Sequence, residues 1–114
     1  MIIYGIKNCD TMKKAFDWLD ANGITYSFHN YKTEGISKAK VEEWLKHFAT
    51  NELINTKGTT FRALSEEEKA SITNKSKAVK LMMTNTSLIK RPVLETGKGY
   101  MLGFKADDWA KKLL

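Results

Sequence analysis

The stretch Met1-Ile-Ile-Tyr-Gly5, followed by Asp10-Thr-Met-Lys-Lys-Ala-Phe-Asp-Trp-Leu19, decides the fold of this chain. The first segment is short and apolar, which predicts a buried strand. In the second segment apolar residues recur at helical spacing, which predicts an amphipathic helix. Cys9, the only cysteine among 114 residues, lies in the turn between them. We therefore expect its thiol beside the unpaired N–H groups and the positive dipole end of the helix.

Two further patterns follow this helix. Residues 24–31 alternate apolar with polar side chains after a glycine stop, which predicts a second strand parallel to the first. From about residue 37 to residue 84 the apolar spacing is helical, apart from an irregular segment at 52–64 with a loop at 57–60. Within this block Ser65-Glu-Glu-Glu68 predicts a capping box at the start of a short helix. We expect no strand in the block.

The C-terminal part predicts two strands and a helix. Pro92–Glu95 and Tyr100–Phe104 flank a glycine-rich turn as a β-hairpin, and an amphipathic helix carrying Trp109 follows. The element order β-α-β, helical block, β-β-α is typical of a thioredoxin-like α/β fold. We therefore predict a four-stranded mixed sheet with a helical insertion at about residues 37–84, in a single domain over residues 1–114. The last helix is expected to cover one face of the sheet.

The composition narrows the cellular setting and the partners. The chain has 19 Lys plus Arg against 13 Asp plus Glu, a formal net charge of +6. This excess suits small anionic molecules, but the lysines are scattered without interleaved aromatics, so nucleic acid is not favoured as a partner. No apolar run is long enough to span a membrane, and the N-terminus lacks the pattern of a signal peptide. One cysteine gives no disulfide framework, so we expect a cytoplasmic protein.

Cys9 is the candidate nucleophile. A helix N-terminus favours the thiolate, which is the reactive form of cysteine, although an isolated cysteine also often serves as a small buried apolar residue. Asp10 is expected to cap the helix. Met12 stands where a C-x-x-C motif would have its second cysteine, so an internal disulfide is excluded. The remaining chemistry is a monothiol cycle in which a small thiol such as glutathione resolves a mixed disulfide.

Arg91-Pro92 is the second informative pair. Pro92 stands at the start of a predicted strand, where a missing N–H is tolerated. Arg91 is a fixed cation that can hold a carboxylate or an oxyanion with two hydrogen bonds, or else be an ordinary surface arginine. His29 and His47 have no cysteine or carboxylate partners at ligand spacing, so we predict neither a metal site nor a bound cofactor.

Several motifs carry a resemblance to a known family. Tyr4-Gly-Ile-Lys-Asn-Cys-Asp-Thr11, Asn55-Thr-Lys-Gly-Thr-Thr60 and Ile89-Lys-Arg-Pro92, followed by Leu102-Gly-Phe104, resemble the arsenate reductase (ArsC) family. The likeness is greatest to its YffB branch, whose relatives include the Spx regulators. It covers essentially the whole chain and implies a cytoplasmic protein with a thioredoxin-like fold and a helical insertion.

The resemblance also assigns roles to residues. The nucleophilic cysteine of the arsenate reductases matches Cys9, and the arginine of their Arg-Pro motif matches Arg91, with the bond to Pro92 expected to be cis. The two further arginines that those enzymes use for the oxyanion fall near Thr56 and Phe104, neither of which is basic. Resemblance to the YffB branch implies a glutathione-dependent thiol reductase with a single nucleophilic cysteine.

Three functions follow as hypotheses. The leading one is a monothiol oxidoreductase with glutathione as co-substrate. The second is a glutathione- and glutaredoxin-coupled arsenate reductase that uses Arg91 with a lysine such as Lys57. The third is an Spx-like protein-binding regulator without catalysis. For the leading hypothesis the expected catalytic residues are Cys9 and Arg91, and the expected residues for substrate or glutathione are Asn8, Thr11, Arg91 and Pro92.

Overall fold

The computed structural model describes residues 1–114, and these form two compact units. Residues 1–34 and 91–114 make up the first unit, which we call the sheet unit. Residues 35–90 make up the second, which we call the helical unit. The elements of the sheet unit are β1 (Ile2–Gly5), α1 (Asp10–Ala21), β2 (Ser27–Asn30), α2 (Tyr31–Glu34), β3 (Val93–Thr96), β4 (Gly99–Leu102) and α8 (Ala106–Leu113).

The sheet has four strands in the order β2-β1-β3-β4. β1 pairs with β2 in parallel, whereas β3 pairs antiparallel with both β1 and β4. The predicted four-stranded mixed sheet is therefore confirmed. The register places Ile3 opposite both Phe28 and Leu94, so these apolar residues share one face of the sheet.

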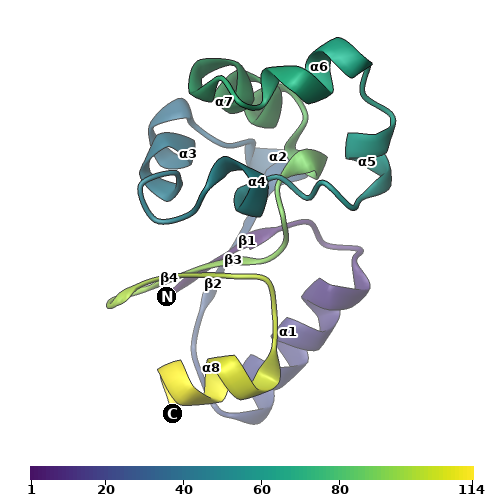
Figure 1. The fold of residues 1–114 in the computed structure, drawn as a ribbon. Coiled ribbons are helices and arrows are strands. Elements are labelled where there is room, and N and C mark those ends of the chain that lie inside the picture. Colours follow the sequence, from purple (N-terminus) through teal and green to yellow (C-terminus); the bar gives the residue numbers. More distant parts are fainter. The chain divides into compact units, whose positions relative to one another are not determined.

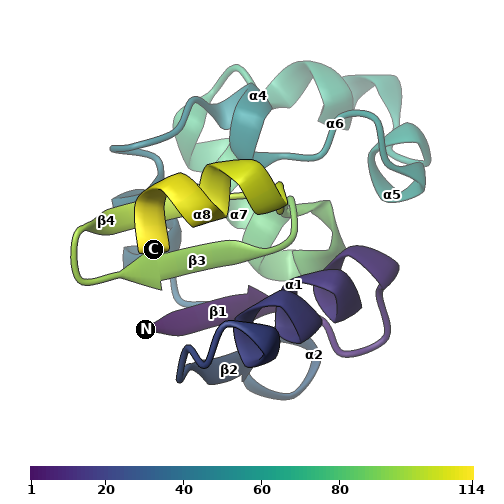
Figure 2. The same cartoon turned by 90° about the horizontal axis from the view of Figure 1, so that it is seen from below.

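Helices α1 and α8 cover that apolar face. Figure 1 shows both helices on the same side of the sheet, and Figure 2 shows α8 over β3 and β4 with α1 beside β1 and β2. The expected cover by the last helix is confirmed, because Trp109 is buried and its Nε1 donates a hydrogen bond of 3.1 Å to the carbonyl oxygen of Gly103. The core of the unit is formed by Ile3, Met12, Ala15, Leu19, Leu94 and Trp109.

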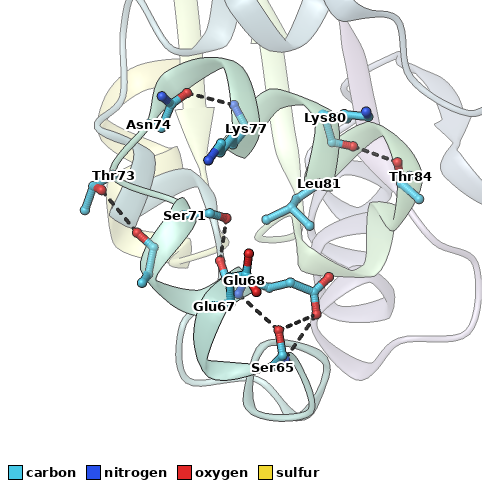
Figure 3. Close-up of a pocket in the computed structure, with 11 residues that line it drawn as sticks. Ser65, Glu67, Glu68, Ser71, Thr73, Asn74, Lys77, Lys80, Leu81 and Thr84 are labelled. Carbon is cyan, nitrogen blue, oxygen red and sulfur yellow. Dashed lines mark hydrogen bonds between the residues drawn. The ribbon is translucent and has the colours of Figure 1, made fainter.

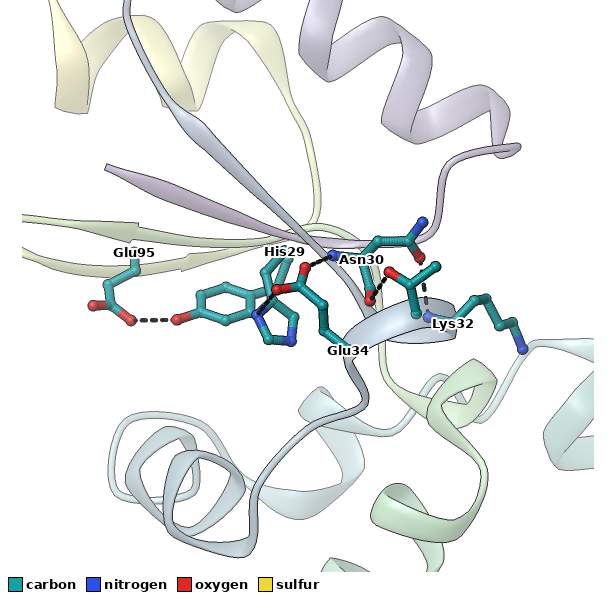
Figure 4. Close-up of polar contacts among 7 residues, drawn as sticks. His29, Asn30, Lys32, Glu34 and Glu95 are labelled. Carbon is teal, nitrogen blue, oxygen red and sulfur yellow. Dashed lines mark hydrogen bonds and ion pairs between the residues drawn. The ribbon is translucent and has the colours of Figure 1, made fainter.

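The second strand is shorter than the alternation predicts. Strand β2 covers only residues 27–30, because its partner β1 offers four residues and the register ends at Gly5 opposite Asn30. Beyond Asn30 local hydrogen bonds turn the chain into α2: the Asn30 side chain accepts from the N–H of Lys32, and the Glu34 carboxylate accepts from the N–H of Asn30, both at 3.0 Å (Figure 4). The prediction of a strand over 24–31 was therefore wrong at both ends, since such side-chain bonds compete with a strand ladder.

The opposite face of the sheet carries polar and aromatic side chains. The Tyr4 hydroxyl donates a hydrogen bond of 3.0 Å to the Glu95 carboxylate, and the centroid of its ring lies 4.9 Å from that of the His29 ring. His29 in turn lies 4.0 Å from a Glu34 oxygen (Figure 4). Tyr31 is buried, and this burial, with a smaller contribution from Tyr4, raises the pKa of its hydroxyl. Tyr31 is therefore neutral at physiological pH.

The helical unit has no strand of its own, as predicted. Its only ladder contact is an isolated bridge between Ile54 and Ile89. The predicted capping box is confirmed: Ser65 Oγ accepts from the N–H of Glu68, and the Glu68 carboxylate accepts from the N–H of Ser65, both at 3.1 Å. The helices are α3 (Lys38–Trp44), α4 (Thr50–Leu53), α5 (Thr59–Arg62), α6 (Glu66–Ser71) and α7 (Lys75–Thr84), with a 3₁₀ turn at Thr86–Leu88.

The segment predicted as irregular, residues 52–64, holds α5 and the end of α4. The predicted loop at 57–60 is wrong in its second half, because Gly58 is the N-cap of α5 and its N–H donates to the carbonyl of Asn55 at 3.1 Å. Helices this short carry too few periodic positions to show in the sequence. None of the helices in the chain is both long and apolar enough to cross a membrane.

Candidate functional site

Cys9 is the N-cap residue of α1. Its backbone is extended (φ −146°, ψ 130°), while its carbonyl already accepts the first helical hydrogen bond from the N–H of Lys13 at 2.9 Å. The expectation that Asp10 caps the helix was therefore wrong, because Asp10 is already the first helical residue. The placement of the thiol at the positive end of α1 follows directly from the turn that joins it to β1.

The surroundings of Cys9 favour its thiolate. Partial burial by itself raises the pKa of the thiol, but the N–H of Met12, the guanidinium of Arg91 and the N–H of Thr11 together outweigh it and lower the pKa. The Cys9 side chain makes no capping hydrogen bond to α1. Hydrogen-bond donors interact more strongly with a negatively charged sulfur than with a neutral thiol. The site thus raises the fraction of the nucleophilic form.

The sheet register brings Arg91 to Cys9. Strand β3 runs antiparallel to β1 with Val93 opposite Tyr4, so the residues before Val93 lie beside those that follow β1. The peptide bond between Arg91 and Pro92 is cis, as the family resemblance implies, and Pro92 is buried at the start of β3. Arg91 hydrogen-bonds the Cys9 sulfur and also favours its thiolate by charge. Two residues 82 positions apart in the numbering are therefore joined in one site.

An open groove leads away from Cys9 between α1 and β2. It has a volume of about 900 Å³, and its apolar lining consists of Phe16, Tyr26 and Phe28. We call it the aromatic groove. The Phe16 ring stacks on the Tyr26 ring with 5.6 Å between the ring centroids, and it meets the Phe28 ring edge-on with a centroid distance of 5.0 Å. The polar rim includes Lys7, Asn8, Asp10, Lys13, Asp17 and Glu34.

The hydroxyl of Tyr26 interacts with carboxylates of α1. Partial burial, together with the charge of Asp20 and a hydrogen bond to its carboxylate, raises the pKa of the Tyr26 hydroxyl. Asp17, which lines the groove, adds a smaller effect in the same direction. The hydroxyl therefore stays protonated at physiological pH.

The structure places the other predicted site residues as follows. Asn8 lines the groove beside Cys9, and Thr11 acts through its backbone N–H while its residue is exposed. The three groove aromatics were not predicted as site residues. The helical spacing predicts Phe16 on the apolar face of its helix, and its ring lines the groove only because that helix packs beside β2. The available signal was the alternation of Tyr26 and Phe28, although only Phe28 lies in the observed strand β2.

Phe104 stands near a position where the arsenate reductases have an arginine. Its ring packs edge-on against the rings of Trp109 and Trp18, with centroid distances of 4.8 Å and 6.3 Å. Phe104 does not line the groove. It is part of the aromatic packing around α8. The structure also contains no group of three His, Cys, Asp or Glu residues placed to hold a metal ion.

A second hollow, of about 720 Å³, lies between α6 and α7 in the helical unit (Figure 3). Its polar side chains form hydrogen bonds with nearby backbone groups: Ser71 Oγ donates to the carbonyl of Glu68 at 2.6 Å, and Asn74 Oδ1 accepts from the N–H of Lys77 at 3.1 Å. No thiol lines it. The groove at Cys9 is therefore the stronger candidate for chemistry.

Known proteins resemble this chain over nearly its whole length. The model of the ArsC family matches residues 4–112. The chain belongs to the ArsC family. Among solved structures, this ArsC chain is 45% identical to a protein named YFFB, with a TM-score of 0.94 and coverage of 99% of this chain and 98% of that one. An arsenate reductase (ArsC) related protein from Brucella melitensis is 46% identical, with a TM-score of 0.77 and coverage of 99% and 94%.

The family also connects this chain to regulators. The global transcriptional regulator Spx of Streptococcus mutans is 26% identical over 104 residues, which are 89% of this chain and 74% of Spx. These findings confirm the family, its YffB and Spx relatives and the thioredoxin-like fold expected from the sequence. A thiol-based reductase and a regulator are the two classes of function that they support.

Proposed function

We propose that this ArsC-family chain is a glutathione-dependent thiol–disulfide reductase with Cys9 as its single nucleophile. The observation that carries the proposal is the Cys9 thiol itself, whose pKa is lowered at the start of α1 beside Arg91 and at the end of an open groove. Arg91 has two functions in this proposal: it stabilises the thiolate, and its guanidinium is a cation suited to a glutathione carboxylate. Asn8 and Thr11 supply polar groups of the same turn.

The reaction needs no second protein thiol. The Cys9 thiolate attacks the glutathione sulfur of a mixed disulfide between glutathione and another thiol, the S–S bond breaks, and the other thiol leaves as a thiolate that takes up a proton. The thiolate of a glutathione then attacks the Cys9-bound glutathione, which releases oxidised glutathione and restores the Cys9 thiolate. The substrate disulfide gains two electrons and glutathione supplies them. Because this cycle consumes reduced glutathione, we place the protein in a reducing cytoplasm.

Arsenate reduction is less well supported by the site. An arsenate oxyanion calls for several cations, but the rim of the groove holds two lysines against three carboxylates, and Phe104 is part of the aromatic packing around α8. A disulfide is uncharged at its reacting atoms and has no such requirement. Turnover of arsenate to arsenite with glutathione and a glutaredoxin would contradict this ranking.

The test is reduction of the mixed disulfide of glutathione and 2-mercaptoethanol by glutathione. The Cys9→Ser variant should lose this activity, since a serine hydroxyl is not ionised at neutral pH, and unchanged activity would refute the proposal. Arg91→Met should lower kcat/KM by about tenfold or more, because it removes a donor to the thiolate and an anchor for the carboxylate. Arg62→Met is the matched control, since Arg62 is the only other arginine in the chain and does not line the groove.

A regulatory function is the second candidate, and the similarity to Spx favours it. It predicts binding to a protein partner that does not depend on the thiol. Recovery of RNA polymerase by the wild type and equally by Cys9→Ser, with no disulfide reductase activity in either, would favour the regulator. Met12 argues against a redox-switched version, because it leaves Cys9 without a second thiol to pair with.

A further inference from the structure

We propose that the aromatic groove selects disulfides whose non-glutathione half carries an uncharged aromatic or aliphatic group next to its sulfur. This inference rests on the proposed function and adds the class of substrate. It assigns the glutathione half of the mixed disulfide to Arg91 and the other half to Phe16, Tyr26 and Phe28.

The lining of the groove carries the first part of the argument. Three aromatic rings are each only partly buried and lie together beside Cys9: one comes from α1, one from β2, and that of Tyr26 from the residue just before β2. An apolar group that covers these rings removes their surface and its own from water, and aromatic pairs add attraction beyond the buried area.

The distribution of charge decides which half of the substrate lies here. The rim places Lys7 and Lys13 against Asp10, Asp17 and Glu34, so the groove offers no net positive charge. Glutathione carries two carboxylates and one ammonium group, and the cation suited to a carboxylate is Arg91, which touches the Cys9 sulfur and does not line the groove. The groove therefore suits an uncharged group, and the glutathione half suits the Arg91 side.

The chemistry follows from this arrangement. The Cys9 thiolate attacks the glutathione sulfur of the mixed disulfide, the S–S bond breaks, and the half in the groove leaves as a thiolate and takes up a proton. Cys9 is left bonded to glutathione. A second glutathione thiolate then attacks that glutathione sulfur, which forms oxidised glutathione and regenerates Cys9. The groove thus binds the leaving group, and its contacts raise the rate of the first step.

The test compares two mixed disulfides of glutathione, one with benzyl mercaptan and one with 2-mercaptoethanol. Both share the glutathione half, so the ratio of their kcat/KM values, after subtraction of the uncatalysed rates, reports on the groove alone. We expect a ratio of about tenfold or more in favour of the benzyl compound. Tyr26→Ala should lower the ratio by roughly threefold or more, and Tyr26→Phe should keep it, since the ring is retained.

Controls separate the two proposals. Tyr100→Ala alters an aromatic residue of β4, at the opposite edge of the sheet from β2, and should leave the ratio unchanged. If Tyr26→Ala does not fold, Phe28→Leu replaces a ring of the lining with a smaller apolar group and should also lower the ratio. Reduction of both compounds at equal kcat/KM, or a ratio that survives a folded lining variant, overturns the groove inference alone. If the wild type reduces neither compound, the proposed function itself fails.

Discussion

Replacement of Gly5 by alanine tests how closely the end of β1 packs against the start of α1. A Cβ on Gly5 would lie 2.5 Å from Sδ and 2.6 Å from Cε of Met12, whereas ordinary contacts between such atoms need about 3.5–4.0 Å. Met12 is fully buried in the core with Ile3 and Leu94. An overlap of roughly 1 Å in a close-packed interior must be relieved by a new rotamer or a shift of α1, and overpacking of this kind costs about 1–3 kcal/mol.

The assay is urea unfolding of the wild type, Gly5→Ala, Met12→Leu and the double variant, followed by circular dichroism. Met12→Leu keeps the side chain apolar and of similar volume, and should cost less than about 1.5 kcal/mol. A leucine Cδ atom takes the place of Sδ, but leucine has no atom at the Cε position of methionine, so the substitution removes one of the two close contacts. In this background Gly5→Ala should lose about 0.5 kcal/mol or more of its cost, which a double-mutant cycle measures directly.

Gly97→Ala is the matched control. A Cβ at Gly97 would meet no atom within 4 Å, so this substitution should change the free energy of unfolding by no more than about 0.5 kcal/mol. The reasoning is refuted if Gly5→Ala is as well tolerated as Gly97→Ala. It is also refuted if the cost of Gly5→Ala is the same with leucine at position 12, because the clash would then not involve Met12.

Three further predictions concern the thiol and the helical unit. Arg91→Met should raise the pKa of Cys9, because a hydrogen bond and a positive charge that lower it are removed; the pH dependence of alkylation by iodoacetamide measures this, and an unshifted profile would count against contact with Arg91. Because the pKa of Cys9 is lower in the folded protein, the free energy of unfolding of the wild type relative to Cys9→Ala should rise with pH up to the unfolded thiol pKa of about 8.5. This contribution should be lost as the pH falls through the folded pKa, and urea unfolding across this range that showed the opposite trend would contradict the assignment. Ser65→Ala removes the acceptor for the N–H of Glu68 and should destabilise α6 by about 1 kcal/mol; hydrogen exchange at the start of α6, compared with the exposed Ser76→Ala, measures the change, and equal protection in both would refute the cap.

The sequence predicted those helices and caps that depend only on neighbouring residues. The apolar positions of α1 and the Ser65 capping box are properties of a few neighbouring residues, so the sequence displays them. The strand at residues 24–31 was predicted too long because its ends depend on the length of β1 and on the side chains of Asn30 and Glu34. The helix α5 was missed because a single turn has almost no periodicity.

The candidate site likewise has a part that the sequence predicts and a part that it does not. Cys9 was predicted because the strand and the helix on either side of it are neighbours along the chain. The groove was not predicted, because it exists only where Phe16 of α1 meets Phe28 of β2 and Tyr26, the residue just before β2. The packing role of Phe104 also could not be predicted from the sequence, because its ring contacts Trp18 of α1 as well as Trp109 of α8.

The sequence by itself determined that this chain has one thiol at the start of a helix, no second thiol to pair with it, and the order of elements of a thioredoxin-like fold. These properties depend on the identities and spacing of neighbouring residues. Only the tertiary structure decided what surrounds the thiol. The antiparallel pairing of β1 with β3 brings Arg91 to Cys9, and the packing of α1 on β2 builds the aromatic groove. The physical reason is that charge and apolar surface act over a few ångströms in space, regardless of the separation along the chain.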